Sequence, residues 1–306
     1  MNKSYSYLNV LIIGMGLIGS SIARNLKENK IAEKIYAIDN NKKIINTTQE
    51  LKIVDDIENN LNKYTIQFDL IFICTPLSAY KSIFDQLNNY VTQPTLMTDV
   101  GSTKVSVIED YKSIIDNKNI AFLPAHPIAG LEKSGPEFGF ANLFGNRYCI
   151  LTPINDDDKF IEKIASVWIS FGMTTQIMDA NRHDRVLAMT SHIPQLIAYS
   201  VVGTATDLET QMKEEVIKYS AAGFRDFTRL AGSDPVMWRD IYEKNKEAVL
   251  EMLGRFSEDL LTFQKAIRND DFKFLEDKFY QSKEIRSTIE KMGQAGSFDP
   301  TEKNKN

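Results

Sequence analysis

The chain has 306 residues, which is enough for two domains that each bury a hydrophobic core. Hydrophobic residues make up 43% and charged residues 25% of it, as is usual in soluble globular proteins. Because the formal net charge is -5, no excess of basic residues favours nucleic acid or an anionic membrane as a partner. The two cysteines, Cys74 and Cys149, lie in apolar runs without metal-ligand spacing, so we expect core residues and no metal site.

The N-terminal segment shares some features with a signal peptide, namely Lys3 followed by an apolar run over residues 8–23. Three glycines interrupt that run in a regular pattern, and no later span is expected to be long enough for a membrane helix. These features favour a cytoplasmic protein without a membrane partner.

Residues 8–13 form a short and nearly continuous apolar run, which predicts a strand buried on both faces of a parallel sheet. A glycine-rich turn and then a stretch with helical spacing follow it. In such a turn the first glycine permits a tight bend, the second lets the backbone approach a pyrophosphate, and the third lets helix and strand pack closely. The helix N-terminus would face the anion. The residues predicted to bind a dinucleotide here are Gly14, Gly16, Leu17, Ile18 and Gly19.

A second predicted strand, residues 34–39, ends at Asp39, which lies 20 residues after Gly19. A carboxylate at this place accepts hydrogen bonds from both ribose hydroxyls and repels a 2′-phosphate. The expected cofactor is therefore NAD rather than NADP. The alternative for Asp39 is an acidic turn residue without a ligand.

Strands and helices continue to alternate along the chain. Residues 69–74 predict a buried strand that ends at Thr75 and Pro76, and residues 95–100 predict another that leads to Ser102. In open α/β sheets ligands bind beyond the carboxyl ends of the strands, so Thr75 and Pro76 are expected at the cofactor. Ser102 has two candidate roles: it orients a catalytic imidazole, or it caps the helix that follows.

His126, one of three histidines, follows an apolar run and directly precedes Pro127. A residue before proline is held in extended geometry, which predicts a non-helical turn at a strand end. Because a neutral imidazole accepts a proton near pH 7, His126 is a candidate general base; the alternative is a histidine that hydrogen-bonds loop backbone. A long loop that contains Glu132 comes next, and loops of this kind often carry function.

A predicted strand, helix and strand over residues 148–178 complete the first domain, and helical periodicity then replaces strands. We therefore predict an α/β fold. An N-terminal Rossmann-type nucleotide-binding domain, residues 1–179, is followed by an all-α domain, residues 180–292. The polar tail, residues 293–306, is expected to be disordered.

The second domain holds the remaining candidate residues. An apolar stripe over residues 186–201 predicts one helix, in which Pro194 introduces a kink that can aim His192 into a cleft. His183, which lies beside Asp184 at the start of this helix, is expected to be exposed.

Arg225 and Arg229 lie one helical turn apart, and the planar fork of arginine suits a substrate carboxylate. Pairing with Asp226 or another surface acid is the alternative. The helical pattern over residues 235–266 is unusually long, which indicates packing between subunits.

Taken together, these motifs make the chain similar to the prephenate/arogenate dehydrogenases, the oxidative enzymes of tyrosine biosynthesis. The resemblance covers nearly the whole chain, residues 8–292. It rests on five segments in this order: residues 14–19, 99–104 (Asp-Val-Gly-Ser-Thr-Lys), 125–130 (Ala-His-Pro-Ile-Ala-Gly), 191–194 (Ser-His-Ile-Pro) and 223–238. The first segment is common to many dehydrogenases, whereas the set in this order is specific.

The resemblance implies NAD-dependent oxidation of prephenate, with loss of carbon dioxide, by a homodimer formed through the helical domain. It implies that His126 deprotonates the ring hydroxyl and that Ser102 lies beside it near the nicotinamide. It further implies that His192 lies at the substrate cleft and that Arg225 anchors a substrate carboxylate, with Arg229 as the weaker candidate. No stretch of this sequence remains for a fused mutase or regulatory domain, so control by tyrosine would act at the active site.

Three alternatives stay open. Arogenate, alone or together with prephenate in a broad cyclohexadienyl dehydrogenase, would place an acid such as Glu132 against the substrate amine. A β-hydroxyacid dehydrogenase would normally have a lysine in the helical domain, and residues 183–203 contain none. A non-catalytic NAD-binding sensor would leave both His126 and Arg225 unexplained.

Overall fold

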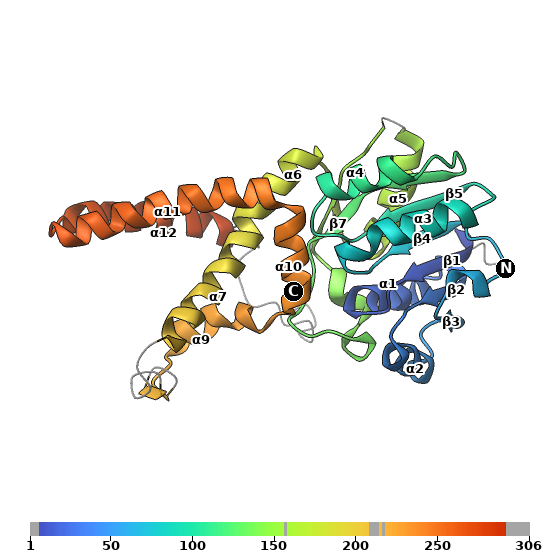
Figure 1. Cartoon of the computed structure of the whole chain (residues 1–306), viewed down its shortest axis with the longest axis horizontal. Helices are drawn as coiled ribbons and strands as arrows, with labels where there is room; N and C mark the ends of the chain where they lie inside the picture. The colour runs from blue at the N-terminus through green and yellow to red at the C-terminus, as the bar shows by residue number, and fades with distance from the viewer. Residues whose placement is uncertain (1–5, 156–157, 208–213, 216–217, 292–306) are drawn as a thin grey trace. The chain divides into compact units, whose positions relative to one another are not determined.

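The computed structural model describes residues 6–155, 158–207, 214–215 and 218–291 (Figure 1). The chain divides between Val249 and Leu250 into two compact units. The first unit contains all the candidate site residues. The tail that is predicted to be disordered, residues 293–306, lies outside the described residues.

A six-stranded parallel sheet forms the centre of the first unit, as the alternating apolar runs predict. Its strands are β1 (Tyr7–Ile13), β2 (Ala32–Ile38), β3 (Asp56–Glu58), β4 (Leu70–Ile73), β5 (Thr95–Asp99) and β6 (Ile120–Leu123). Their order is β3-β2-β1-β4-β5-β6, and all neighbouring pairs are parallel. The order reverses between β1 and β4, and at such a reversal the carboxyl ends of the strands open a ligand crevice. The predicted Rossmann-type fold is confirmed.

Helices cover both faces of this sheet (Figure 1). They are α1 (Leu17–Glu28), α3 (Tyr80–Tyr90), α4 (Val105–Ile114) and α5 (Asp158–Ser170), while α2 (Lys42–Leu51) follows β2. Alternate side chains of β1 pack into the two hydrophobic cores, one on each face of the sheet, because successive strand residues point to opposite faces. Val10 and Ile12 pack with α1 and α5, whereas Leu11 and Ile13 pack with α3 and α4. A strand covered on both sides must be apolar throughout, which explains the continuous run.

Short 3₁₀ turns complete this part of the chain: η1 (Leu61–Lys63), η2 (Leu77–Ala79), η3 (Pro136–Phe138) and η4 (Ala141–Phe144). Three further strands form a separate sheet: β7 (Ala125–Pro127), β8 (Tyr148–Leu151) and β9 (Thr174–Ile177). β7 is antiparallel to β8, and His126 lies opposite Ile150. The extended geometry predicted for His126 is present, but it belongs to a paired strand rather than to a turn, because β8 offers it an edge.

The turn between β1 and α1 depends on two of its three glycines. Gly14 has a φ of +96°, and a Cβ added to it would lie 2.7 Å from the carbonyl oxygen of Cys74. A Cβ added to Gly19 would lie 2.0 Å from the carbonyl oxygen of Gly14. A Cβ on Gly16 would meet no heavy atom within 4 Å. Packing therefore requires glycine at the bend and at the helix–strand contact, but not at Gly16.

After β9 the chain is helical, as predicted. The elements are α6 (Ala180–Leu187), the π-helical turn η5 (Ala188–His192), α7 (Ile193–Thr206), α9 (Ala222–Thr228), the 3₁₀ turn η6 (Arg229–Gly232), α10 (Pro235–Lys244), α11 (Lys246–Arg268) and α12 (Phe272–Lys291). Pro194 has no N–H to donate, and the π-helical turn comes just before it. A π-helical turn thus interrupts the α-helix at His192, where the sequence predicts a kink.

One helical stretch, Ala180–Ala205, is long and apolar enough to cross a membrane by length and composition, so the expectation of no such span was wrong. Its polar side chains nevertheless behave as in a protein core. His183, His192 and Gln195 are buried and hydrogen-bonded to groups of the same unit. A core helix accounts for this pattern, because buried polar groups need internal partners.

The second unit comprises the rest of α11 and α12. The rings of Phe263 and Phe279 stack with their centroids 6.1 Å apart. Many large apolar side chains of these two helices are exposed: Leu250, Leu260, Leu261, Ile267, Phe272, Phe279, Tyr280 and Ile285. Such a number of exposed large apolar side chains on two helices is typical of a surface that another protein covers.

Substitution of the glycines tests the account of the β1–α1 turn. Gly19→Ala should destabilise the protein by about 3 kcal/mol, because the new methyl group overlaps a backbone oxygen that cannot move independently of β1. Gly16→Ala is the matched control and should cost less than about 1 kcal/mol. Thermal and urea unfolding of both variants measures the difference, and equal losses of stability would contradict this packing.

Candidate active site

A cavity of about 710 Å³ lies at the carboxyl ends of β1, β2 and β4. Its lining includes five of the residues predicted to bind the cofactor: Gly14, Gly16, Asp39, Thr75 and Pro76. Residues 134–137, from the loop that follows His126, also line it. Leu17 and Gly19 are instead buried beneath the turn, and Ile18 packs against the core below.

The polar groups around this cavity fit a dinucleotide. Gly16 is the N-cap of α1 and offers no side chain to the helix, so the N–H groups of the first turn are available to an anion. Asp39 is held by two backbone donors, Met15 N at 2.9 Å and Asn41 N at 2.9 Å. Each carboxylate oxygen accepts one of these bonds and retains a further lone pair, which a ribose hydroxyl can use.

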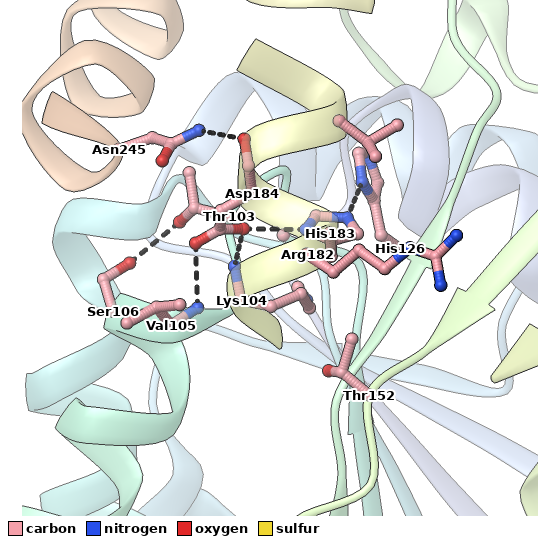
Figure 2. Close-up of polar contacts among 12 residues, drawn as sticks. Thr103, Lys104, Val105, Ser106, His126, Thr152, Arg182, His183, Asp184 and Asn245 are labelled. Atoms are coloured by element: carbon pink, nitrogen blue, oxygen red, sulfur yellow. Dashed lines mark hydrogen bonds and ion pairs between the residues drawn. The ribbon is translucent and has the colours of Figure 1, made fainter. Parts of the chain in front are cut away.

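His126 begins a chain of three side chains that runs into the protein (Figure 2). Its Nδ1 lies 2.9 Å from Nε2 of His183, and Nδ1 of His183 lies 2.7 Å from Oδ1 of Asp184. His126 comes from β7, whereas His183 and Asp184 come from α6. The contact therefore joins the second sheet to the first helix of the helical part.

The expectation that His183 is exposed was wrong, because the side chain is fully buried. The buried face of the helix shares Leu187 and Ile193 with the predicted apolar stripe but excludes Val186 and Met189. Val186 and Met189 are 39% and 51% exposed, while His183, Asp184 and Leu187 face inward. The buried residues recur about once per helical turn, but Val186 and Met189 have the same kind of spacing, so periodicity alone did not decide which face is buried.

The carboxylate of Asp184 has two further donors. Oδ1 accepts a hydrogen bond from the backbone N–H of Lys104 at 2.8 Å, and Oδ2 accepts one from that of Val105 at 3.0 Å (Figure 2). Asp184 thus caps α4 from another element, so the alternative role of Ser102 as the cap was wrong. Ser102 is half-buried, and no hydrogen bond joins it to His126 in the described part of the chain.

A buried ion pair lies beneath His126. Nζ of Lys104 lies 2.6 Å from Oδ2 of Asp99 and donates to the carbonyl oxygen of Ala125 at 2.7 Å. Oδ1 of Asp99 accepts from the N–H of the same Ala125 at 2.9 Å. Both charged side chains are fully buried, and burial lowers the pKa of Lys104 while Asp99 opposes that shift. The pair clamps the residue before His126, a role that the sequence motif around Ser102 did not reveal.

His126 is neutral at physiological pH. Burial lowers its pKa well below 6.5, and nearby His183, Lys104 and His192 lower it further. A neutral imidazole has one nitrogen that accepts a proton, which is the property that a general base requires.

His192 offers a hydrogen-bond donor instead of a proton acceptor. The side-chain amide of Asn245 donates to Nδ1 of His192 at 3.1 Å and to the carbonyl oxygen of Asp184 at 2.9 Å. Since Nδ1 accepts, the ring proton of the neutral imidazole sits on Nε2, which is buried and has no partner among the described residues. Burial lowers the pKa of His192 to about 4. A buried N–H donor without a partner is unusual in a folded protein, which marks His192 as a candidate ligand contact.

The two candidate arginines differ in their contacts. Arg229 forms an ion pair with Glu132, which lies in the loop after His126. Arg225, on α9, is exposed and makes no ion pair within the described part of the chain. The structure thus places Arg229 and Glu132 together and leaves the charge of Arg225 available.

Comparison with known proteins agrees with these features. Residues 22–176 match the family model "Prephenate dehydrogenase, nucleotide-binding domain", and residues 179–281 match "Prephenate dehydrogenase, dimerization domain". Cyclohexadienyl dehydrogenase from Zymomonas mobilis is 34% identical, over 92% of this chain and 96% of that protein. Prephenate dehydrogenase from Lactococcus lactis is 32% identical, over 92% of this chain and 77% of that protein.

A solved structure has the same fold along nearly the whole chain. It is prephenate dehydrogenase from A. aeolicus in complex with hydroxyphenyl propionate and NAD+, with a TM-score of 0.87 and 32% identity. The match covers 94% of this chain and all of that one, 100%. With both family models matched in sequence order, the chain belongs to the prephenate dehydrogenase family.

Proposed function

We propose that this protein is an NAD-dependent prephenate dehydrogenase, which converts prephenate to 4-hydroxyphenylpyruvate and carbon dioxide. The observation that carries the proposal is the neutral His126, held in a chain of hydrogen bonds and followed by a loop that lines the nucleotide cavity. A dehydrogenase of a ring alcohol needs such a base beside its hydride acceptor. Membership of the family supports the same reaction.

Each residue of the site has its own role in the proposed reaction. Bound NAD supplies the acceptor for the hydride that leaves the carbinol carbon. His126 removes the hydroxyl proton, which raises the electron density that expels the hydride, and loss of carbon dioxide then makes the ring aromatic. Nε2–H of His192 donates to a substrate oxygen, and Ser102 lies beside the nicotinamide. The first turn of α1 binds the pyrophosphate and Asp39 binds the ribose.

Arogenate is the second candidate substrate. The observation in its favour is Glu132, an acid in the loop after His126, together with a relative whose name covers cyclohexadienyl substrates in general. However, Glu132 already pairs with Arg229, so its charge is less available to a substrate amine. This contact favours prephenate. Family membership leaves no support for a β-hydroxyacid dehydrogenase or a non-catalytic sensor.

We also propose a homodimer formed through the helical domain. The apolar side chains exposed on α11 and α12 support it, as does the match to a dimerization domain. A cytoplasmic location fits the two cysteines, both of which are free thiols.

His126→Ala tests the proposed base. Turnover should fall by about two to four orders of magnitude, because a general base contributes that much, while the affinity for NAD stays unchanged. NADH production with prephenate and with arogenate measures turnover, and titration calorimetry measures NAD binding. Unchanged turnover on both substrates would reject His126 as the base; a higher kcat/KM of the wild type for arogenate would reject the proposed substrate.

A comparison of two arginine variants tests the substrate anchor. Arg225→Ala should raise KM roughly 10- to 100-fold with little change in kcat, because a free guanidinium that binds a carboxylate contributes to ground-state binding. Arg229→Ala provides the comparison, since its guanidinium already has Glu132 as a partner. A larger increase of KM in Arg229→Ala would assign the anchor to Arg229 instead.

A further inference from the structure

The groups behind His126 have a fixed direction of hydrogen bonding. Asp184 accepts two backbone N–H bonds, so its carboxylate is an acceptor, and Nδ1 of His183 must donate to it. A neutral His183 then has a bare Nε2, which can only accept. Nδ1 of His126 therefore donates to His183, and Nε2 of His126 is left without a proton. Asp184 thus determines the tautomer of His126, to which it is linked through His183 (Figure 2).

We propose that His126, His183 and Asp184 form a closed proton relay that stores the substrate's proton during oxidation and then returns it. The proposal rests on the role of His126 as the base. The hydroxyl proton moves to Nε2 of His126, and the proton on Nδ1 of His126 moves to Nε2 of His183. His126 is again neutral, and His183 becomes an imidazolium that donates to the ionised Asp184.

The surrounding charges favour His183 over His126 as the place for the positive charge. His126 faces Lys104 before α4, His183 on α6 and His192 on the π-helical turn, all of which oppose a charge on it. His183 also faces Lys104, but the carboxylates of Asp184 and Asp99 act in the other direction. A charge on His183 meets a carboxylate at 2.7 Å, which offsets part of its desolvation.

The stoichiometry of the reaction requires storage rather than release. Prephenate loses a hydride and carbon dioxide, and the oxygen that gave up its proton ends as a phenol, which has a proton again. No net proton reaches solvent. A relay that ends inside the protein suits this balance: His183 is 0% exposed and Asp184 is 3% exposed, so the stored proton has no path to solvent except back through His126.

Two substitutions at His183 separate a relay from simple orientation. His183→Gln retains an oxygen that accepts a bond from Nδ1 of His126 but cannot take up a proton, and His183→Ala removes both functions. The relay predicts that kcat falls roughly 10²-fold in both variants. Orientation alone predicts that glutamine restores turnover, which would overturn the proposal. Thr190→Ala is the control on the same helical stretch, exposed and bonded to its own helix, and should match the wild type.

The pH dependence of kcat/KM gives a readout that a purely structural role would not change. Without His183 the charge must stay on His126, where burial, Lys104 and His192 still oppose it and no carboxylate offsets them as Asp184 does at His183, so protonation of the free enzyme becomes harder. The acidic limb of the profile in His183→Gln should therefore move to lower pH by about one unit, although the plateau is lower. An acidic limb at the wild-type position would overturn the relay.

The wild-type enzyme provides a test that does not depend on the folding of variants. Because two protons move in the relay, the rate in mixtures of H₂O and D₂O should follow a curve, and a linear dependence or none would overturn it. His126→Ala is assayed in parallel. Turnover in that variant would reject the proposed base itself, whereas an inactive His126→Ala beside a fully active His183→Gln would reject the relay alone.

Discussion

The carboxylate of Asp184 is the contact on which the site depends. It accepts hydrogen bonds from the backbone at Lys104 and Val105 and from the ring of His183. A buried carboxylate without such partners would destabilise the fold, so the folded state needs all three donors. Through them Asp184 caps a helix of the nucleotide-binding fold and orients the imidazole that contacts His126. Oδ1 takes part in both roles, because it accepts from Lys104 N–H and from the ring of His183, while Oδ2 accepts from Val105 N–H.

A second buried charge completes the electrostatic arrangement. Lys104 and Asp99 bind the carbonyl and the N–H of Ala125, so the strand that holds His126 is fixed by an ion pair rather than by a long ladder. The Lys104 ammonium also helps to keep His126 neutral. Burying an ion pair does not in general stabilise a protein, so the Lys104–Asp99 pair is better explained by its effect on His126. It positions the backbone next to His126, the proposed base, and disfavours a charge on that side chain.

Local sequence patterns predict much of this fold. The Gly14 to Gly19 turn and the continuous apolar runs predict a parallel sheet, because a strand with helices on both faces must be apolar throughout. The separate sheet around His126 is not predictable in this way, since β7 has three residues and its partner β8 is distant in sequence. The hydrogen bonds of His183 and Asp184 determine which face of α6 is buried. A stripe of apolar residues places Val186 and Met189 inside, but the fold buries His183 and Asp184, whose bonds to β7 and α4 no periodicity reveals.

The two histidines proposed to act on the substrate have opposite hydrogen-bonding states, although burial lowers the pKa of both. Asn245 donates to Nδ1 of His192 and leaves a proton on Nε2, whereas Asp184, through His183, leaves Nε2 of His126 bare. Nitrogen-15 NMR of the imidazoles tests this assignment directly, because the chain has 3 histidines and few signals to assign. At neutral pH the free enzyme should show His126 protonated on Nδ1 and His192 on Nε2. A proton on Nε2 of His126 would contradict the account, since that nitrogen could not then accept one from the substrate.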